Sequence, residues 1–408
     1  MGKTLIGTAL AVAAALSFAT PALSADLVVW HSYRGEEKAA FEKAIADYNA
    51  ANAGKHKVTT LAVAFDAFAD KISAAVPRGQ GPDVFIYAQD RLGGWIEAGK
   101  TIEPLDFFLD ENVKKRFLPG MLDAMTYRGQ VYGLPLNFKA IAMYYNKALV
   151  KAPPATTGEL VKTAKALTNP AAGQFGLVYW YSNFYYHAPL WNGFGAPVFD
   201  AQRRPVLNNP EGVRSLELLL KWVDKDKILP AEPSTALVTQ LFNKGKAAIV
   251  FSGPWFLGEI DSAIGFGLAT LPTIDEAGGK PMKPWTTVEG LYIAAPSKNK
   301  DAAYELIKYL SDVPAAKILA LQGRQTPANR DVYADKDVAA DPILRVFRQQ
   351  VENSIPMPNY AEMAMFWTPI TTAMNTIVQK SASPKAALDV AQKETVERIS
   401  TLRVSPKK

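Results

Sequence analysis

The chain has 408 residues, no cysteine, and 45 basic against 39 acidic residues, which gives a formal net charge of +6. The lack of cysteine excludes disulfides, a thiol nucleophile and a lipid-anchored cysteine. Basic and acidic residues are interspersed, whereas a nucleic-acid-binding protein gathers its basic residues on one face, so we expect no nucleic-acid partner.

A secretory signal peptide is predicted at the N-terminus. Lys3 is the only charged residue before Asp26, and the stretch from Leu5 to Phe18 is apolar and rich in alanine. Small residues follow it, and cleavage is expected after Ser24 or Ala25. No comparable apolar run occurs later in the sequence. We therefore expect a soluble periplasmic protein that begins at Asp26 and carries no lipid anchor.

Strands and helices alternate along the mature chain. In its first part we expect strands over residues 27–30, 58–63 and 84–87, and helices over residues 36–49 and 65–76. After Pro135 further strands are expected over residues 141–145, 175–180, 247–251, 265–271 and 291–294. Helices are expected to follow the cap residues Thr156, Asn209 and Ser383 and to cover residues 301–311. The pattern predicts an α/β protein of two lobes, with mixed, mostly parallel sheets flanked by helices.

The motifs of common enzyme classes do not occur in the sequence. Its three histidines, His31, His56 and His187, do not have the spacing of metal ligands. Neither a Gly-x-Ser-x-Gly elbow nor a glycine loop for phosphates or dinucleotides is present. Two carboxylates for glycoside hydrolysis can come from distant segments, but no acidic residue stands out as a catalyst. We expect a non-enzyme without a metal or cofactor, and keep a polysaccharide-active enzyme as the alternative.

The segment Gly81–Trp95, GPDVFIYAQDRLGGW, places an unusual set of side chains at the end of a strand. Its apolar strand delivers Tyr87, Asp90 and Arg91 to the carboxyl end, where ligands of open α/β sheets usually bind. The alternative is that Asp90 caps the next helix and Arg91 is solvated. From this segment alone, the cap is the favoured interpretation.

Several segments, in the same order, resemble the maltose/maltodextrin-binding family among the solute-binding proteins of bacterial ABC sugar importers. They are GPDVFIYAQDRLGGW, LPLNFKAIAMYYNKAL, LFNKGKAAIVFSGPW, LPT and MPNYAEMAMFW. The resemblance implies the type II periplasmic binding protein fold, with two lobes around a cleft that closes on its ligand. It assigns residues 1–25 to the signal peptide, residues 26–137 and 290–337 to the N-terminal lobe, and residues 138–289 and 338–405 to the C-terminal lobe.

The resemblance also implies which residues contact the ligand. Tyr87 matches a cleft aromatic that stacks on a sugar ring, and with this context ligand contact replaces capping as the favoured role of Asp90 and Arg91. The other matching positions are a cation near one end of the sugar, cleft tryptophans, stacking tyrosines and a wall residue: Arg34, Trp255, Trp367, Tyr185, Tyr186 and Met357.

Two departures from the family pattern bear on the identity of the ligand. Lys139 and Asn183 stand where the maltose-binding pattern has glutamates. A cation in place of a carboxylate reverses which hydroxyl groups can be bound, so the departures favour a ligand other than maltose: another disaccharide such as trehalose, a different glucoside, or a sugar that bears an acid group. The alternative is that Lys139 pairs with Asp90 across the cleft or points to solvent.

The sequence therefore predicts a monomeric periplasmic protein that captures a di- or oligosaccharide and delivers it to the permease subunits of an inner-membrane ABC transporter. A chemoreceptor is a further candidate partner. Related folds also carry iron, polyamines or anions, but the aromatic residues are dispersed, and Lys139 and Arg34 oppose a cationic ligand.

Overall fold

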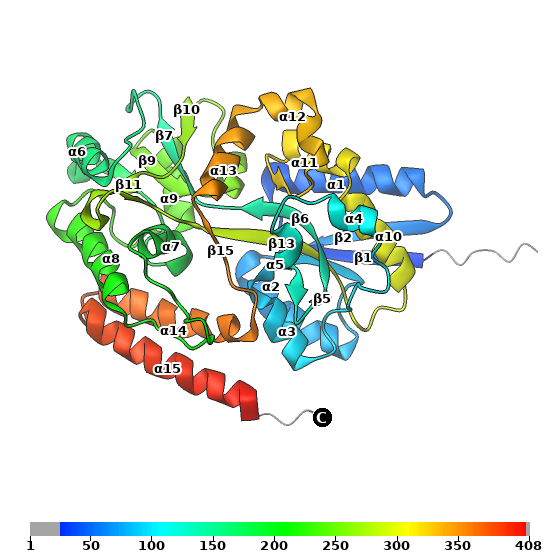
Figure 1. Cartoon of the computed structure of the whole chain (residues 1–408). Helices are drawn as coiled ribbons and strands as arrows, with labels where there is room; N and C mark the ends of the chain where they lie inside the picture. The colour runs from blue at the N-terminus through cyan, green and yellow to red at the C-terminus, as the bar shows by residue number, and fades with distance from the viewer. Residues whose placement is uncertain (1–24, 405–408) are drawn as a thin grey trace, which may run out of the picture.

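The computed structural model describes residues 25–404 as two lobes, each built on its own sheet (Figure 1). The expected signal peptide, apart from Ala25, lies outside the described residues. We call the elements packed on the larger sheet the first lobe and those packed on the smaller sheet the second lobe. Two large hydrophobic cores follow this division. One takes buried residues from 27 to 138 and from 288 to 328, and the other from 141 to 285 and from 357 to 399.

The sheet of the first lobe has the strand order β14-β6-β13-β3-β1-β2, with β15 paired to β13. Its strands are β1 (Ala25–His31), β2 (His56–Ala62), β3 (Val84–Ala88), β6 (Gly133–Lys139), β13 (Trp285–Ile293), β14 (Thr326–Pro327) and β15 (Ile355–Pro356). The helices around it are α1 (Gly35–Ala51), α2 (Phe65–Ala75), α3 (Leu92–Ala98), α4 (Glu111–Lys115), α5 (Met121–Ala124), α10 (Lys300–Leu310) and α11 (Val313–Leu321). As predicted, α1 buries Phe41, Ile45 and Tyr48 on one face.

The sheet of the second lobe has the order β10-β7-β9-β8. Its strands are β7 (Ala142–Asn146), β8 (Phe175–Val178), β9 (Ala247–Ser252) and β10 (Phe266–Ala269). The later helices of the chain and those around this sheet are α6 (Thr157–Leu167), α7 (Phe184–Gly193), α8 (Pro210–Leu220), α9 (Thr235–Asn243), α12 (Lys336–Ala340), α13 (Pro342–Glu352), α14 (Ala361–Val378) and α15 (Pro384–Val404).

Short elements complete the chain. The two small hairpins are β4 (Thr126–Tyr127) with β5 (Gln130–Val131), and β11 (Thr273–Ile274) with β12 (Lys280–Pro281). The 3-10 turns are η1 (Val76–Arg78), η2 (Gln89–Arg91), η3 (Pro170–Ala172), η5 (Pro254–Glu259), η6 (Asp275–Ala277) and η7 (Asp331–Ala334), and η4 (Lys221–Lys225) is a π-turn.

The three predicted helix caps are present. The side chains of Thr156, Asn209 and Ser383 accept hydrogen bonds from backbone N–H groups of the first helical turns, at 3.2, 2.7 and 3.3 Å. Each bond satisfies an N–H that has no partner within its helix. Local chemistry therefore sets where α6, α8 and α15 begin.

Both sheets are mixed, but parallel pairs are fewer than expected. Parallel pairing joins β1 to β2 and β3, β8 to β9, and β13 to β15. The long strand β13 runs antiparallel to β3 and β6, and β7 runs antiparallel to β9 and β10. The cause is the connection between the lobes, since β6 leads into the second lobe and β13 returns from it (Figure 1).

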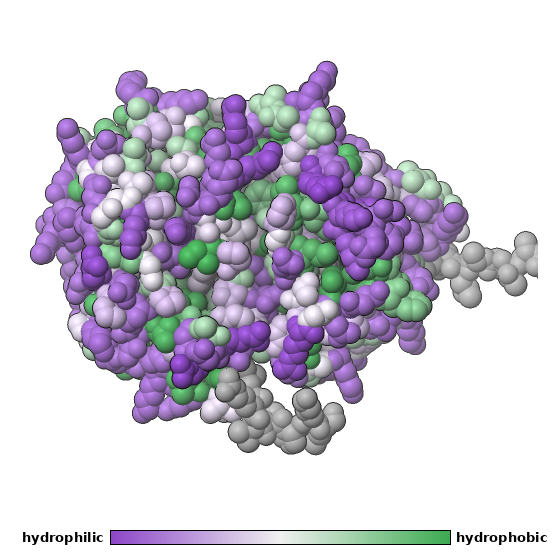
Figure 2. All heavy atoms as spheres, viewed as in Figure 1, coloured by the Kyte–Doolittle hydropathy of each residue, from purple (hydrophilic) through white to green (hydrophobic). Residues whose placement is uncertain are grey.

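The visible face of the molecule is mostly polar (Figure 2), and its helices lack a membrane-spanning candidate among residues 25–404. Hydrophilic side chains cover most of the face in Figure 2. Within residues 25–404, no helix combines the length and the apolar composition needed to cross a membrane.

The packing of α3 against α14 provides a first test of the fold. A Cβ atom on Gly93 would lie 2.5–2.7 Å from backbone atoms of Asn359, Tyr360 and Ala361, which cannot rotate away. Gly93→Ala is therefore expected to lower the free energy of unfolding by about 3 kcal/mol, measured by denaturant titration. Gly94→Ala is the matched control, because its Cβ would meet only the Ala364 methyl at 3.3 Å. Equal stability of the two variants would contradict this packing.

Candidate functional site

Strand ends from distant parts of the sequence meet at one edge of the larger sheet. The parallel strands β1, β2 and β3 all end there, because Ala62 pairs with His31 and Trp30 with Phe85. The antiparallel strand β13 begins at the same edge, where its Glu289 pairs with Ala88, and β6 ends there. This edge thus collects side chains that follow four strands, beside the second lobe.

Asp90 connects the two lobes at this edge. Its carboxylate oxygen Oδ2 accepts a hydrogen bond of 2.9 Å from the indole Nε1 of Trp367 on α14, and lies 3.3 Å from the Arg91 guanidinium. Burial raises the pKa of the Asp90 carboxyl, and the Arg91 charge and the Trp367 bond oppose that rise. The capping interpretation is wrong, because Asp90 lies within η2 and α3 has no side-chain cap.

A continuous row of aromatic rings extends from Trp367 along the second lobe. Trp367 contacts Trp285 at 5.8 Å between ring centroids, Trp285 contacts Tyr185 at 6.3 Å, and Tyr185 contacts Trp255 at 6.1 Å. Tyr186 also lies 6.1 Å from Trp255. The row is also joined to strand β13 of the larger sheet, because Trp285 lies on that strand and the Tyr185 hydroxyl is 2.6 Å from Oγ1 of Thr287.

The row ends in a small recess between the lobes. Its walls are Arg34, Trp180, Tyr186, Thr235, Val238, Thr239, Ser252, Trp255, Phe256 and Glu259. Across its mouth the guanidinium of Arg34, before α1, lies 2.5 Å from the Glu259 carboxylate in η5. Glu259 also accepts a hydrogen bond of 2.6 Å from the Thr239 hydroxyl. Arg34 therefore contacts the second lobe directly.

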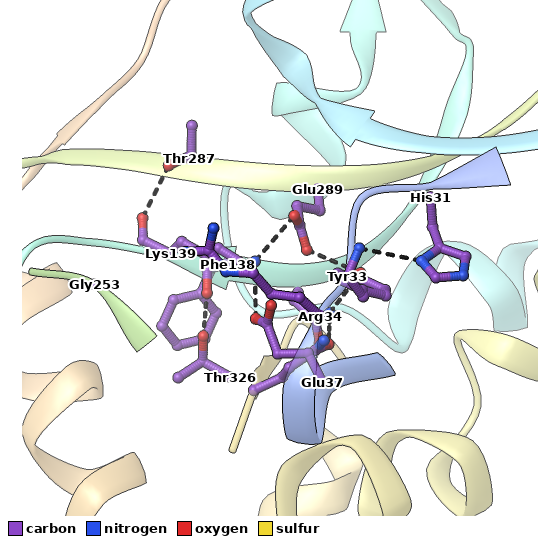
Figure 3. A network of polar contacts seen from close by, with 12 residues as sticks. His31, Tyr33, Arg34, Glu37, Phe138, Lys139, Gly253, Thr287, Glu289 and Thr326 are labelled. Carbon is purple, nitrogen blue, oxygen red and sulfur yellow. Dashed lines mark hydrogen bonds and ion pairs between the residues drawn. The ribbon is translucent and has the colours of Figure 1, made fainter. Parts of the chain in front are cut away.

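Lys139 lies in a buried ionic cluster beside this recess. Its Nζ is 3.1 Å from Glu37 of α1 and 3.0 Å from Glu289 of β13, and both carboxylates are directed toward it (Figure 3). Tyr33 donates a hydrogen bond of 2.9 Å to Glu289. The Lys139 ammonium also lies 5.9 Å from the Trp255 ring, close enough for a cation–π contact. Both expectations for a non-binding Lys139, pairing with Asp90 or pointing to solvent, are therefore wrong.

The cluster has one cation for two carboxylates. Burial alone would lower the pKa of Lys139, but Glu289 and Glu37 outweigh it and raise that pKa above its usual value. Burial raises the pKa of Glu37, and Lys139 offsets this only in part because Glu289 repels Glu37 while sharing the same ammonium. Lys139 thus stays charged at neutral pH and is paired with two carboxylates of its own neighbours.

Tyr87 is buried rather than open for stacking. Its side chain is surrounded by Phe65, Phe68 and Trp95, and the residue is only 6% exposed. The ring of Phe65 lies parallel to that of Tyr87, at 5.7 Å and 3°. One face of the predicted stacking residue is therefore covered by another aromatic ring.

Asn183 and Met357 lie next to the site, but the Asn183 side chain caps a helix and the Met357 side chain is buried. The Asn183 side chain caps α7 by accepting a hydrogen bond of 2.9 Å from the Tyr185 backbone. Met357 is 4% exposed, and its backbone oxygen accepts a hydrogen bond of 3.0 Å from the Gln89 side chain. Asn183 thus orients the helix that carries two tyrosines, and Met357 packs behind the edge.

Sequence reasoning missed part of this site. The missed residues are Glu37, Trp180, Glu259, Trp285, Thr287 and Glu289. A signal for Glu289 exists in the sequence, since WTTVEGLYI places one acid in an otherwise mostly apolar run, and that whole strand is buried. The others lie in segments whose proximity depends on the fold.

The model of the bacterial extracellular solute-binding protein family matches residues 32–317. The chain belongs to this family. The match takes in the whole smaller sheet, strands β2, β3, β6 and β13 of the larger sheet, and most of the site, including Arg34, Asp90, Lys139, Tyr185 and Trp255.

Other members of the solute-binding protein family are similar over nearly the whole chain. A maltotriose-binding protein of Pyrococcus abyssi is 30% identical over 385 residues, covering 92% of this chain and 83% of the relative. A galactooligosaccharide-binding protein of Bacillus subtilis is 28% identical, covering 90% and 87%. Among solved structures, the maltose/maltodextrin-binding domain MalE of Bdellovibrio bacteriovorus, bound to maltotriose, is similar with a TM-score of 0.85 at 25% identity, covering 92% of this chain and 100% of that one.

Proposed function

We propose that this solute-binding protein captures a short oligosaccharide between its lobes and delivers it to the permease subunits of an ABC importer. The mature protein would begin at Asp26, act as a periplasmic monomer, and perform no chemistry on the sugar. The lobes would comprise residues 26–137 with 290–337 and residues 138–289 with 338–405, so that β13 crosses the boundary between them and β15 adds a strand of the second lobe to the larger sheet. A chemoreceptor is a further candidate partner.

The observation that carries the proposal is the row of aromatic rings bordered by polar groups of both lobes. Sugar rings have apolar faces that stack on aromatic side chains and hydroxyl groups that both donate and accept hydrogen bonds. Trp255, Tyr185 and Trp367 supply ring faces, while Asp90 and Arg91 supply an acceptor and a donor. A ligand that contacts both lobes favours the closed state by its differential affinity.

The relatives support the class of ligand. They are named for maltotriose, galactooligosaccharide and maltooligosaccharide binding, which have in common a short, neutral oligosaccharide. The buried cluster around Lys139 fits a neutral ligand, because its ammonium is already paired with two carboxylates. Lys139 would therefore shape the site rather than bind an acidic sugar.

Thermal unfolding of the mature protein with a panel of ligands tests the proposal. At a hundredfold excess over its dissociation constant, a true ligand adds about 2.7 kcal/mol to the free energy of unfolding and raises Tm. We expect shifts with maltotriose, trehalose or galactooligosaccharides and none with polyamines, iron or simple anions. A shift with a control compound alone would refute the sugar assignment, and release of free sugar from the panel would favour the enzyme alternative.

A further inference from the structure

We propose that Phe65 forms an additional sugar-binding subsite at the rim of the first lobe, occupied only by the longer oligosaccharides. The subsite rests on the proposed function and extends it from a class of ligand to a length preference. It takes one pyranose ring beyond those held by the aromatic row of the second lobe.

Phe65 lies at the same sheet edge as the site. It follows β2, whose last residue, Ala62, pairs with His31 at the end of β1. Its ring is parallel to that of Tyr87, which lies on β3 three residues before Asp90. Phe65 is therefore one aromatic ring away from the residues that link the two lobes.

Phe65 is an exposed aromatic residue at the start of α2. The residue is 58% exposed, although the neighbouring Phe68 on the same helix is fully buried. Exposing a large aromatic side chain forgoes the free energy that its burial would contribute. An exposed aromatic ring at the sheet edge that carries the site has a free face on which a sugar ring could stack.

Phe65 is also held in a defined orientation. Its ring rests on Tyr87 at 5.7 Å and 3°, and Tyr87 in turn is fixed edge-on by Phe68 and Trp95. A preorganised platform loses little conformational entropy when a ligand ring stacks on it. By contrast Phe107, the most exposed phenylalanine at 92%, contacts only the neighbouring ring of Phe108 among the aromatic side chains of residues 25–404.

Polar groups lie beside this platform. The Arg91 charge is near enough to the Tyr87 hydroxyl to offset part of the rise that burial causes in the pKa of Tyr87, and the Arg91 side chain is 29% exposed, so part of the guanidinium remains open to a ligand. Asp70 of α2 is near enough to act electrostatically on the same hydroxyl. Arg91 can donate a hydrogen bond to a sugar hydroxyl and Asp70 can accept one, and these two roles complement stacking on the Phe65 ring.

Calorimetric titration of the wild type and Phe65→Ala with di-, tri- and tetrasaccharides of the maltodextrin and galactooligosaccharide series tests this subsite. In the series that binds, we expect Phe65→Ala to weaken the longest ligand about tenfold and to leave the disaccharide unchanged. Phe65→Trp should retain the length preference, and Phe107→Ala should match the wild type.

Two results would overturn the subsite while leaving the proposed function intact. One is wild-type affinity of Phe65→Ala for every ligand, and the other is the same loss at every length, which would indicate a structural role for Phe65. Binding of no oligosaccharide by the wild type would refute the proposed function and the subsite together.

Discussion

Replacing Lys139 by methionine is expected to lower the free energy of unfolding by about 3–5 kcal/mol. Glu37 and Glu289 are 3.1 and 3.0 Å from its ammonium, and their side chains are only 8% and 12% exposed. Without the cation, two buried carboxylates would repel each other with little solvent screening. Denaturant titration of the mature protein measures the loss.

The loss should depend on pH. Burial already raises the pKa of Glu37 in the folded protein, and removing Lys139 raises it further. In the unfolded chain the Glu37 pKa returns to its usual value of 4.5. Between these two pKa values, Glu37 of the variant is protonated in the folded state and ionised in the unfolded state. Where the folded state binds more protons, stability falls as pH rises. The deficit of Lys139→Met should therefore be smaller at about pH 5 than at about pH 8.

Two control variants separate this effect from a general cost of losing a lysine. Lys43→Met removes an ion pair with Asp47 in which both side chains are nearly half exposed, and should change stability by less than about 1 kcal/mol. Replacing all three members, as Glu37→Gln, Lys139→Met and Glu289→Gln, should recover much of the loss. If Lys139→Met were as mild as Lys43→Met, the cluster would not be buried as described.

Trp255→Ala is expected to weaken the binding of the true oligosaccharide by about 2–4 kcal/mol, or roughly 30-fold to 1,000-fold. Trp255 lies where the aromatic row meets the recess, 6.1 Å from both Tyr185 and Tyr186 and 5.9 Å from the Lys139 ammonium. Its removal takes away a ring face and lets water reach the cluster. Titration calorimetry gives the affinity, and Tm shows whether the variant is folded.

A conservative variant identifies the cause of that loss. Trp255→Phe keeps an aromatic face and should retain most of the affinity for the sugar. Trp255→Leu lacks that face and should lose as much affinity as Trp255→Ala. Wild-type affinity of a folded Trp255→Ala would show that the ligand does not stack at this position.

Features set by local sequence could be predicted well. Helix caps such as Asn209 depend on a few neighbouring residues, and the polar end of β3 was visible as Asp90 and Arg91 after an apolar strand. Contacts between the lobes could not be predicted from local sequence. Asp90 and Trp367 are 277 positions apart, and Lys139 and Glu37 are 102 apart, so no local pattern relates them.

Single residues also changed role with their surroundings. Tyr87 matched a stacking position, yet Phe65 covers it, and the alternation of apolar residues in α2 does not reveal which ring lies outermost. The strand β13 was predicted over residues 291–294 and extends over Trp285–Ile293, because its polar residues Thr286, Thr287 and Glu289 are buried through pairing rather than apolar character.

Direct calorimetric titration of the mature protein with maltotriose, trehalose and galactooligosaccharides tests the central claim that both lobes close on a short neutral oligosaccharide. We expect one of them to bind with a stoichiometry of one and a dissociation constant of about 1 μM or lower. A dissociation constant of about 1 μM corresponds to a standard binding free energy of about −8 kcal/mol. Absence of binding to all of them, by a protein that unfolds cooperatively, would contradict the assignment of the aromatic row between the lobes as a sugar site.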